Sequence, residues 1–205
     1  MALPFGTKVY LEDKTLKKIE DLTFGDKVLS VKIEDPECID HSSLYRKYLK
    51  KDSSSNNNYI EKQAISLSST YVYSVFKHKN YTNFISLNNK IISTITPFLV
   101  SKTFENPEKI YIKDSRDMVQ RMNDSEDEKY FMQYLGAQSF GINANSLNKN
   151  IFIDSDNVFL QKRIDSVELN IKPQPAVDVV LLDNHLLVTE NFLCFGSIVG
   201  GVSLL

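Results

Sequence analysis

Cysteine is scarce in this chain of 205 residues, in which only Cys38 and Cys194 occur. Two cysteines do not make the disulfide framework of a small secreted domain, so we expect two free thiols. Cys38 lies in a polar connection and should be exposed, whereas Cys194 lies in an apolar run and should be buried. The three histidines, His41, His78 and His185, lack the spacing of metal ligands, so neither a zinc site nor any other cofactor is expected.

An excess of either charge and long apolar runs are also missing. The formal net charge is -2 and the isoelectric point is about 5.9, which gives no general attraction to nucleic acid. No stretch approaches the roughly 20 apolar residues that span a bilayer. No basic segment followed by an apolar one begins the chain, so secretion by a signal peptide and membrane insertion are not expected.

Short runs of β-branched and aromatic residues recur between turns and predict a mostly β fold. Gly6 and Gly25 mark two early turns, because glycine adopts backbone angles that a side chain forbids. A hairpin is expected at 83–94, with Asn88-Asn89 as its turn, since asparagine tolerates positive φ. With 42% apolar residues, the chain is able to bury the core of one fair-sized β domain.

Strand patterns also occupy the middle and the end of the chain. Tyr71, Tyr73 and Val75 alternate with smaller or polar residues, so we expect these three side chains on one face of a strand. The segment 176–197 is expected to form three short strands that are separated by two polar turns.

Two segments, at about 34–58 and 102–150, lack the alternating strand pattern of the rest of the chain and are expected to be insertions. In the first, apolar residues at helical spacing predict a short basic helix at 42–51. Two interpretations stay open for this helix, a solvated surface or a contact with an acidic partner such as nucleic acid. In the second, a capping box at 125–128 and the apolar stripe that follows predict a helix at 130–135. The acidic box lacks the spaced oxygen ligands and the central glycine of a calcium loop.

Several segments resemble the conserved blocks of the Hint domains that inteins and hedgehog proteins share. The opening phrases at 3–9 (LPFGTKV) and 19–28 (IEDLTFGDKV) resemble the first block, and 91–100 (IISTITPFLV) is similar to the block with a T-x-x-H-P phrase. Asp183-Asn184-His185 stands where the last blocks have a similar phrase. The resemblance implies a single Hint-like β domain over the chain, with small helical insertions and an apolar tail at 198–205.

The reacting residues of that family are missing at the matching positions. Ala2 stands at the place of the nucleophilic cysteine, and its methyl group cannot attack a carbonyl. Thr96 stands where the family has an imidazole that polarises the scissile peptide. Phe195-Gly196 replaces the terminal His-Asn pair, so no carboxamide is present to cyclise. The resemblance therefore implies the fold without the splicing chemistry.

Only His185 and Ser197 remain at positions where the family uses such residues. One interpretation makes His185 an acid or base, and the other, which we favour, places it in a turn where it fixes two strands. Ser197 without an activating base is an ordinary hydroxyl. Protein splicing requires flanking chain on both sides of the domain, and little of it is expected here. Inteins can carry a homing endonuclease domain between the central and last blocks, and the segment 102–150 is too short for one.

These observations favour a non-catalytic Hint-fold protein that is a structural or adaptor component of a larger assembly. The abundance of Asn, Lys, Ile and Ser suggests an AT-rich genome such as those of many phages and viruses. We therefore expect protein partners, further copies of the chain among them, and a place in a virion or the cytoplasm. The apolar end at 192–205 is either a contact surface or simply core. The alternative function is an intein-like autoprocessing (protein-splicing) domain that was inactivated by alanine at position 2.

Overall fold

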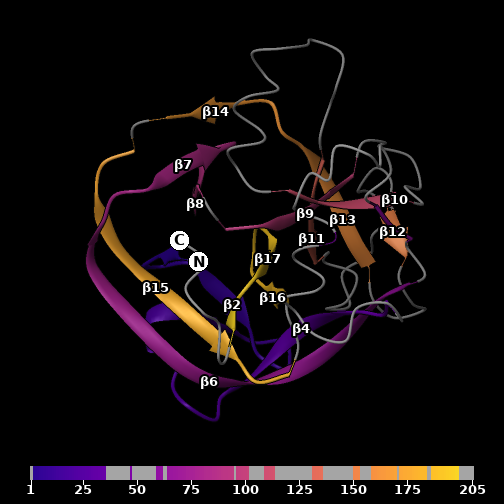
Figure 1. Ribbon diagram of the computed structural model, residues 1–205, viewed down its shortest axis with the longest axis horizontal. Helices are drawn as coiled ribbons and strands as arrows, with labels where there is room; N and C mark the ends of the chain where they lie inside the picture. The colour runs from indigo at the N-terminus through magenta and orange to yellow at the C-terminus, as the bar shows by residue number, and fades with distance from the viewer. Residues whose placement is uncertain are drawn as a thin grey trace.

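The fold consists almost wholly of strands, which Figure 1 shows curling round a shared interior. The computed structural model describes residues 2–35, 47, 59–61, 64–94, 96–101, 109–113, 131–135, 150–152, 158–169, 171–183 and 186–198. Within these ranges no helix is long and apolar enough to cross a membrane. The mostly β class predicted from the sequence is confirmed.

Thirteen strands of the described residues form one strongly curled sheet. In sheet order its main path is β1 (Leu3–Pro4), β15 (Gln174–Leu181), β6 (Ile65–Tyr81), β4 (Lys27–Ile33), β16 (Leu186–Val188), β17 (Leu193–Phe195), β9 (Phe98–Ser101), β11 (Phe131–Leu135), β13 (Val158–Arg163) and β12 (Asn150–Phe152). Three strands pair at its side, β5 (Ile60–Glu61), β10 (Lys109–Lys113) and β18 (Ser197–Ile198).

Two small sheets and one short turn complete the described fold. β2 (Lys8–Tyr10) and β3 (Leu16–Lys18) form a hairpin that leads into the 3-10 turn η1 (Ile19–Asp21). β14 (Val167–Glu168), β7 (Phe84–Leu87) and β8 (Lys90–Ser93) form a three-stranded sheet. All of the pairings among these strands are antiparallel.

β6 connects two parts of the curled sheet because it is 17 residues long and pairs with two different strands along its length. Its first part pairs with β4, and its second part pairs with β15. The register slips between Val72 and Ser74, where β6 carries an extra residue opposite β15. Such a bulge changes the face on which the following side chains lie. Consequently Tyr71 and Tyr73 are exposed while Val75 packs against the core, and the expectation that all three share one face is wrong.

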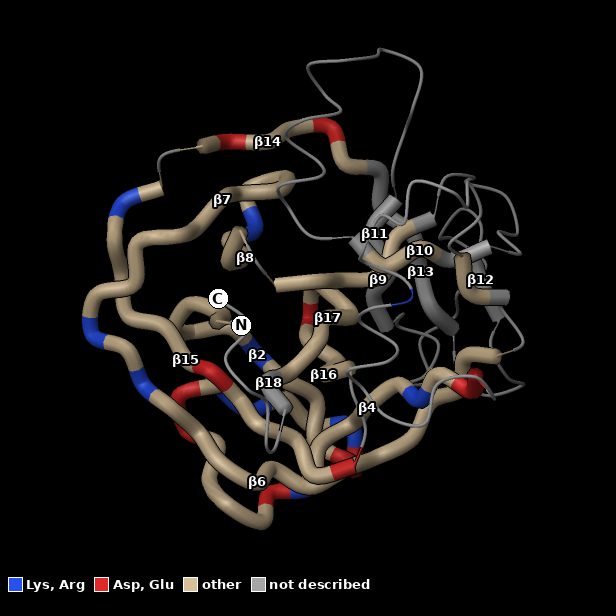
Figure 2. Tube along the Cα trace, in the orientation of Figure 1, with Lys and Arg blue, Asp and Glu red and all other residues tan. Residues whose placement is uncertain are grey.

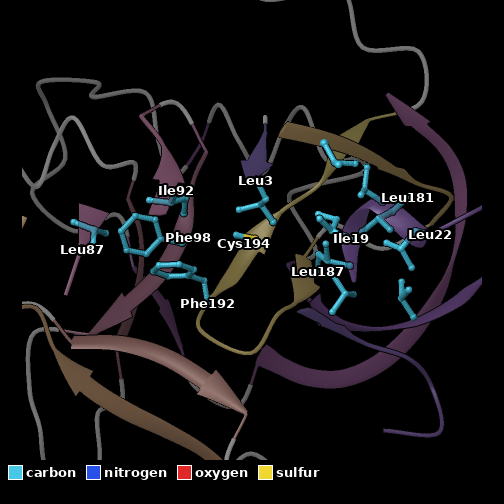
Figure 3. Close-up of a cluster of buried hydrophobic side chains, with 14 of the residues drawn as sticks. Leu3, Ile19, Leu22, Leu87, Ile92, Phe98, Leu181, Leu187, Phe192 and Cys194 are labelled. Carbon is cyan, nitrogen blue, oxygen red and sulfur yellow. The ribbon is translucent and has the colours of Figure 1, made fainter. Parts of the chain in front are cut away.

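The largest buried cluster includes residues from both ends of the described chain, from Leu3 in β1 to Cys194 in β17. Figure 3 shows Leu3, Ile19 and Cys194 pointing into the same interior as the rings of Phe98 and Phe192. Cys194 is a free thiol with no exposed surface, as the sequence predicted, whereas Cys38 lies outside the described residues. The four residues 192–195 are all buried, so this part of the apolar end is core and not a contact surface. The part of that end after residue 198 lies outside the described residues.

The two predicted insertions have different outcomes. At 131–135 the chain forms the strand β11 and not the expected helix, and it pairs with both β9 and β13. Local capping chemistry is outweighed there by the backbone hydrogen bonds of two neighbouring strands. Of the helix expected at 42–51 only Lys47 is described; it is helical and its Nζ lies 2.8 Å from the Asp35 carboxylate. Most of both segments lies outside the described residues.

The predicted hairpin is present as β7 and β8, joined by Asn88 and Asn89 with φ of 50° and 63°. Two positive φ angles in succession are the mark of a type I′ turn, which matches the twist of the flanking strands. The Asn88 side-chain oxygen accepts hydrogen bonds from the backbone N–H groups of Asp165 and Ser166, at 2.9 and 3.1 Å. This turn therefore also holds the chain that enters β14.

We expect the substitution Asn88→Ala to lower the free energy of unfolding by about 1–3 kcal/mol, because two N–H groups lose their acceptor and alanine disfavours positive φ. Urea denaturation measures the change. Asn89→Ala is the matched control, since Asn89 has the same backbone strain and no side-chain hydrogen bond in the described part of the chain. Equal losses in the two variants would show that the acceptor contributes nothing.

Candidate functional site

The first and last strands of the described chain meet on one edge of β15. β1 pairs antiparallel with β15 at Ala176 and Val177, and β18 pairs with it in parallel at Val180 and Leu181. Since β6 occupies the other edge of β15, β1 and β18 lie one after the other along the same edge. Both ends of the described chain are therefore brought to one strand, β15.

The connection before β9 joins the same place. The N–H of Phe195 donates to the carbonyl oxygen of Pro97 at 2.9 Å, and Cys194 pairs with Phe98. The Thr96 hydroxyl donates to the carbonyl oxygen of Ala2 at 3.4 Å. The structure thus collects three of the predicted positions, at Ala2, Thr96 and Phe195-Gly196, from distant parts of the sequence.

Ala2 is fully enclosed at this meeting point. Its side chain has no exposed surface and clusters with Phe84 and Ala176. Tyr81, Ile91 and Ile171 pack around that cluster. The methyl group lies in an apolar environment, and a thiol in such surroundings would have a raised pKa and little of the reactive thiolate form.

The polar groups around Ala2 are hydroxyls that already have partners. Ser93 and Thr96 are both completely buried. The Ser93 hydroxyl lies 3.0 Å from the hydroxyl of Tyr81, and the N–H of Thr96 donates to the Ser93 carbonyl oxygen at 3.1 Å. The hydroxyls of Ser93 and Thr96 do not take up a proton near neutral pH, and their bonds link the segments that meet here.

An imidazole does lie beyond Tyr81, at a place that no sequence motif indicated. His78 Nε2 is 2.9 Å from Asp178 Oδ2, across the pairing of β6 with β15. The ring centroid of His78 is 5.7 Å from that of Tyr81. Tyr81 therefore separates this hydrogen-bonded pair from Ser93. The only signal for the pair is strand register, which sequence inspection does not provide.

Gly196 is closed against β15. A Cβ atom at this position would lie 3.1 Å from the Val179 carbonyl oxygen and 3.1 Å from two carbons of Leu181. Such contacts are tighter than ordinary van der Waals distances, so a larger residue requires its neighbours to shift by a few tenths of an ångström. Phe195, the residue before it, is 2% exposed and belongs to the core. Neither position presents a side chain to a scissile peptide.

Two residues at the end of the chain match the family. Of these, Ser197 lies in β18, and its backbone pairs with that of Val180 in β15. The other, His185, lies outside the described residues together with Asn184. Asp183, at the start of the same phrase, donates its N–H to the Thr70 hydroxyl at 3.2 Å. The described residues contain no cluster of His, Cys, Asp or Glu suited to a metal ion.

Burial raises the pKa of the Cys194 thiol from 9.0 to about 12. Because the protonated thiol is favoured in the folded state, its contribution to stability is complete below about pH 9 and is lost as the pH rises towards about 12. We therefore expect the stability difference between the parent chain and Cys194→Ala to shrink above about pH 9. Urea titrations of both proteins at several pH values measure this difference in the free energy of unfolding. A difference that stays constant above about pH 9 would contradict a raised pKa of Cys194.

The comparisons with known proteins concern the fold. No protein-family model and no curated protein matches the sequence. Solved structures do match. The DnaB intein from Synechocystis sp. PCC 6803 is 12% identical, with a TM-score of 0.50 over 96% of this chain and 99% of its own. A double mutant of an Ssp DnaB mini-intein variant is 11% identical, with a TM-score of 0.52 over 98% of this chain and 94% of its own.

This chain has a Hint-like fold. The alignments cover 96% and 98% of this chain, so the likeness extends over nearly its full length. The fold expected from the sequence blocks is thereby confirmed. At 11% and 12% identity the likeness shows the fold and nothing about chemistry. The chemistry must be argued from the residues at the meeting point.

Proposed function

We propose that this chain is a non-catalytic Hint-fold protein that acts as a structural or adaptor component of a larger assembly. The observation that carries the proposal is the closed meeting point of its first and last strands. Ala2 is buried among apolar side chains, and the hydroxyl of Thr96 is bonded to the Ala2 carbonyl oxygen. Neither the methyl group of Ala2 nor the bonded hydroxyl of Thr96 is suited to attack a carbonyl or to move a proton near neutral pH.

The C-terminal side of the meeting point supports the same proposal. Cleavage by an asparagine requires a carboxamide that reaches its own backbone carbonyl. Gly196 has no side chain, and its backbone approaches β15 so closely that a Cβ would contact the Val179 carbonyl oxygen at 3.1 Å. Both halves of a splicing reaction therefore lack their reacting group.

An interaction role is supported by the exposed aromatic residues on the outer face of the curled sheet. Phe24 is 77% exposed and stands edge-on to Tyr73, with ring centroids 6.3 Å apart. Tyr71 and Leu182 lie close by, since the N–H of Leu182 donates to the Tyr71 carbonyl oxygen. Large apolar side chains that gather on a surface are typical of protein contacts. None of these four side chains belongs to the buried core of the described residues.

The identity of the assembly is a proposal based on composition. An abundance of Asn, Lys, Ile and Ser favours the AT-rich genome of a phage or virus, and a particle component or homo-oligomer in a virion or the cytoplasm fits that origin. Light scattering coupled to size-exclusion chromatography tests the oligomer. A single species at the monomer mass of 23.5 kDa, at every concentration, would contradict the homo-oligomer.

The alternative is an intein-like autoprocessing (protein-splicing) domain that alanine at position 2 has inactivated. The fold fits both functions equally well. The two differ over Thr96 and Gly196, because an inactivation at Ala2 alone leaves the rest of a reactive site in place. Intact mass spectrometry of the purified chain, followed over days, should show an unchanged mass, and the variant described in the Discussion separates the two functions.

A further inference from the structure

The second half of β6 has one edge that no described strand covers. β4 lies on one side of β6 and pairs with residues 65–71, while β15 lies on the other side and pairs with 72–81. On the β4 side, Val72 is bonded to the turn before β4, since the N–H of Gly25 donates to its carbonyl oxygen and its own N–H donates to Asp26. Beyond this point, at 74–80, no described strand follows on that side.

Figure 1 shows this part of β6 on the outer rim of the curled sheet, with β15 on its inner side. In a β-strand, alternate residues direct their N–H and C=O groups to opposite sides. About half of the backbone groups of 74–80 therefore point away from β15. Such an edge is a ready template for one more strand. The segment 74–80, on its side away from β15, is called the outer edge of β6 below.

Two exposed lysines lie on one face of the outer edge, and the other face has one large apolar side chain, Phe76, beside His78, which is bonded to Asp178 of β15. Lys77 and Lys79 are both exposed and, being two residues apart, lie on the same face of the strand. Figure 2 shows this basic rim in blue. Phe76 lies on the opposite face and is 55% exposed. No acidic residue occurs within 74–80, although the whole chain has a net charge of -2.

These charges decide between two occupants of the edge. A second copy that paired through the same edge would bring Lys77 and Lys79 opposite each other, and like charges on facing strands repel. An extended segment with acidic residues at alternate positions would place them opposite both lysines. Apolar residues at the positions between would cover the exposed ring of Phe76.

We propose that the outer edge of β6 binds an extended peptide segment of alternating acidic and apolar residues, which adds one strand to the sheet. The inference rests on the adaptor function and names the class of its partner. The competing explanation is that Lys77 and Lys79 only protect the edge against association, which is a common use of lysine on edge strands. The two explanations differ in whether the backbone of 74–80 becomes hydrogen-bonded.

The test uses the full chain, labelled with ¹⁵N, and a short blocked peptide of alternating Glu and Val. The expected result is saturable binding, with hydrogen exchange of the outward amides in 74–80 slowed by about tenfold or more. The peptide with alternate amides N-methylated should not bind, because it cannot complete the backbone ladder. A peptide of alternating Lys and Val should not bind either.

The double substitution Lys77→Glu with Lys79→Glu should weaken binding of the Glu-Val peptide by about tenfold or more, since two attractive charge pairs become repulsive. Lys18→Glu with Lys90→Glu is the matched control, because it makes the same change in net charge at two exposed positions on other strands. This control should leave binding within about twofold of the parent.

Three results would overturn the proposal. The first is no binding. The second is binding without protection of 74–80, which shows ionic contact alone. The third is protection that grows with chain concentration in the absence of peptide, which assigns the edge to a second copy. None of them alters the mass-spectrometric test of catalysis, so failure of this proposal and failure of the proposed function are distinguishable.

Discussion

Fusion of a partner protein to the N-terminus of the Ala2→Cys variant should give no product that thiol releases. The new thiol would lie where Ala2 has no exposed surface, against Phe84 and Ala176, so its pKa would be raised and the thiolate depleted. Thr96 offers a hydroxyl in place of an imidazole, and a hydroxyl group is a much weaker acid for an acyl transfer near neutral pH. We therefore expect a released fraction equal to that of the unsubstituted fusion.

The experiment compares the Ala2→Cys fusion with the same fusion bearing Ala2, both treated with excess thiol and followed by gel and intact mass. Hydroxylamine treatment is a second test, because it cleaves a thioester without thiol exchange. Release from the Ala2→Cys fusion alone would identify the alternative function, an inactivated autoprocessing domain. The addition of Gly196→Asn should not change the outcome, since its Cβ contacts the Val179 carbonyl oxygen at 3.1 Å.

The substitution Phe192→Ala should have the largest effect on stability, lowering the free energy of unfolding by about 3–5 kcal/mol. The Phe192 ring is 2% exposed and packs against Phe98 with ring centroids 5.8 Å apart (Figure 3). Removal of the ring leaves a cavity between β9 and the turn before β17. Chemical denaturation followed by circular dichroism measures the change.

Phe24→Ala is the control for this prediction. Phe24 is 77% exposed, so the same truncation should change the free energy of unfolding by about 0.5 kcal/mol or less. Equal losses in the two variants would mean that the cluster around Phe98 and Phe192 does not dominate the core. If Phe192→Ala fails to fold, Phe192→Leu provides a smaller change of the same sign.

The successes of the sequence predictions are local in origin. The hairpin of β7 and β8 follows from the backbone preference of Asn88 and Asn89, which needs no knowledge of distant residues. The burial of Cys194 follows from its apolar neighbours in the chain. The Hint-like fold was predicted from phrases at both ends, and the solved structures confirm it.

The failures arise where a distant strand changes the local preference. The expected helix at 130–135 had sound capping chemistry, yet β11 pairs on both sides with strands that are far away in the sequence. Val75 does not share a face with Tyr71 and Tyr73 because a bulge lies between them, and this bulge depends on the pairing of β6 with β15. Neither the ladder nor the bulge has a signature within a few residues.

The candidate site shows the same division. Residue identity alone indicated that Ala2, Thr96 and Gly196 carry a methyl group, a hydroxyl group and a hydrogen atom where the family has a thiol, an imidazole and a carboxamide. Their meeting is decided by the register of β15 with β1 and β18, and by the hydrogen bond from Thr96 to Ala2. The hydrogen bond between His78 and Asp178 likewise exists only through cross-strand register.

By itself the sequence determined the β class, the turn chemistry and the lack of a thiol or hydroxyl at position 2, because each depends on single residues or their near neighbours. Only the tertiary structure decided that the meeting point is closed and that the outer edge of β6 is left without a described neighbour. Burial and strand order are properties of contacts between residues far apart in the chain, and no local pattern of side chains encodes them.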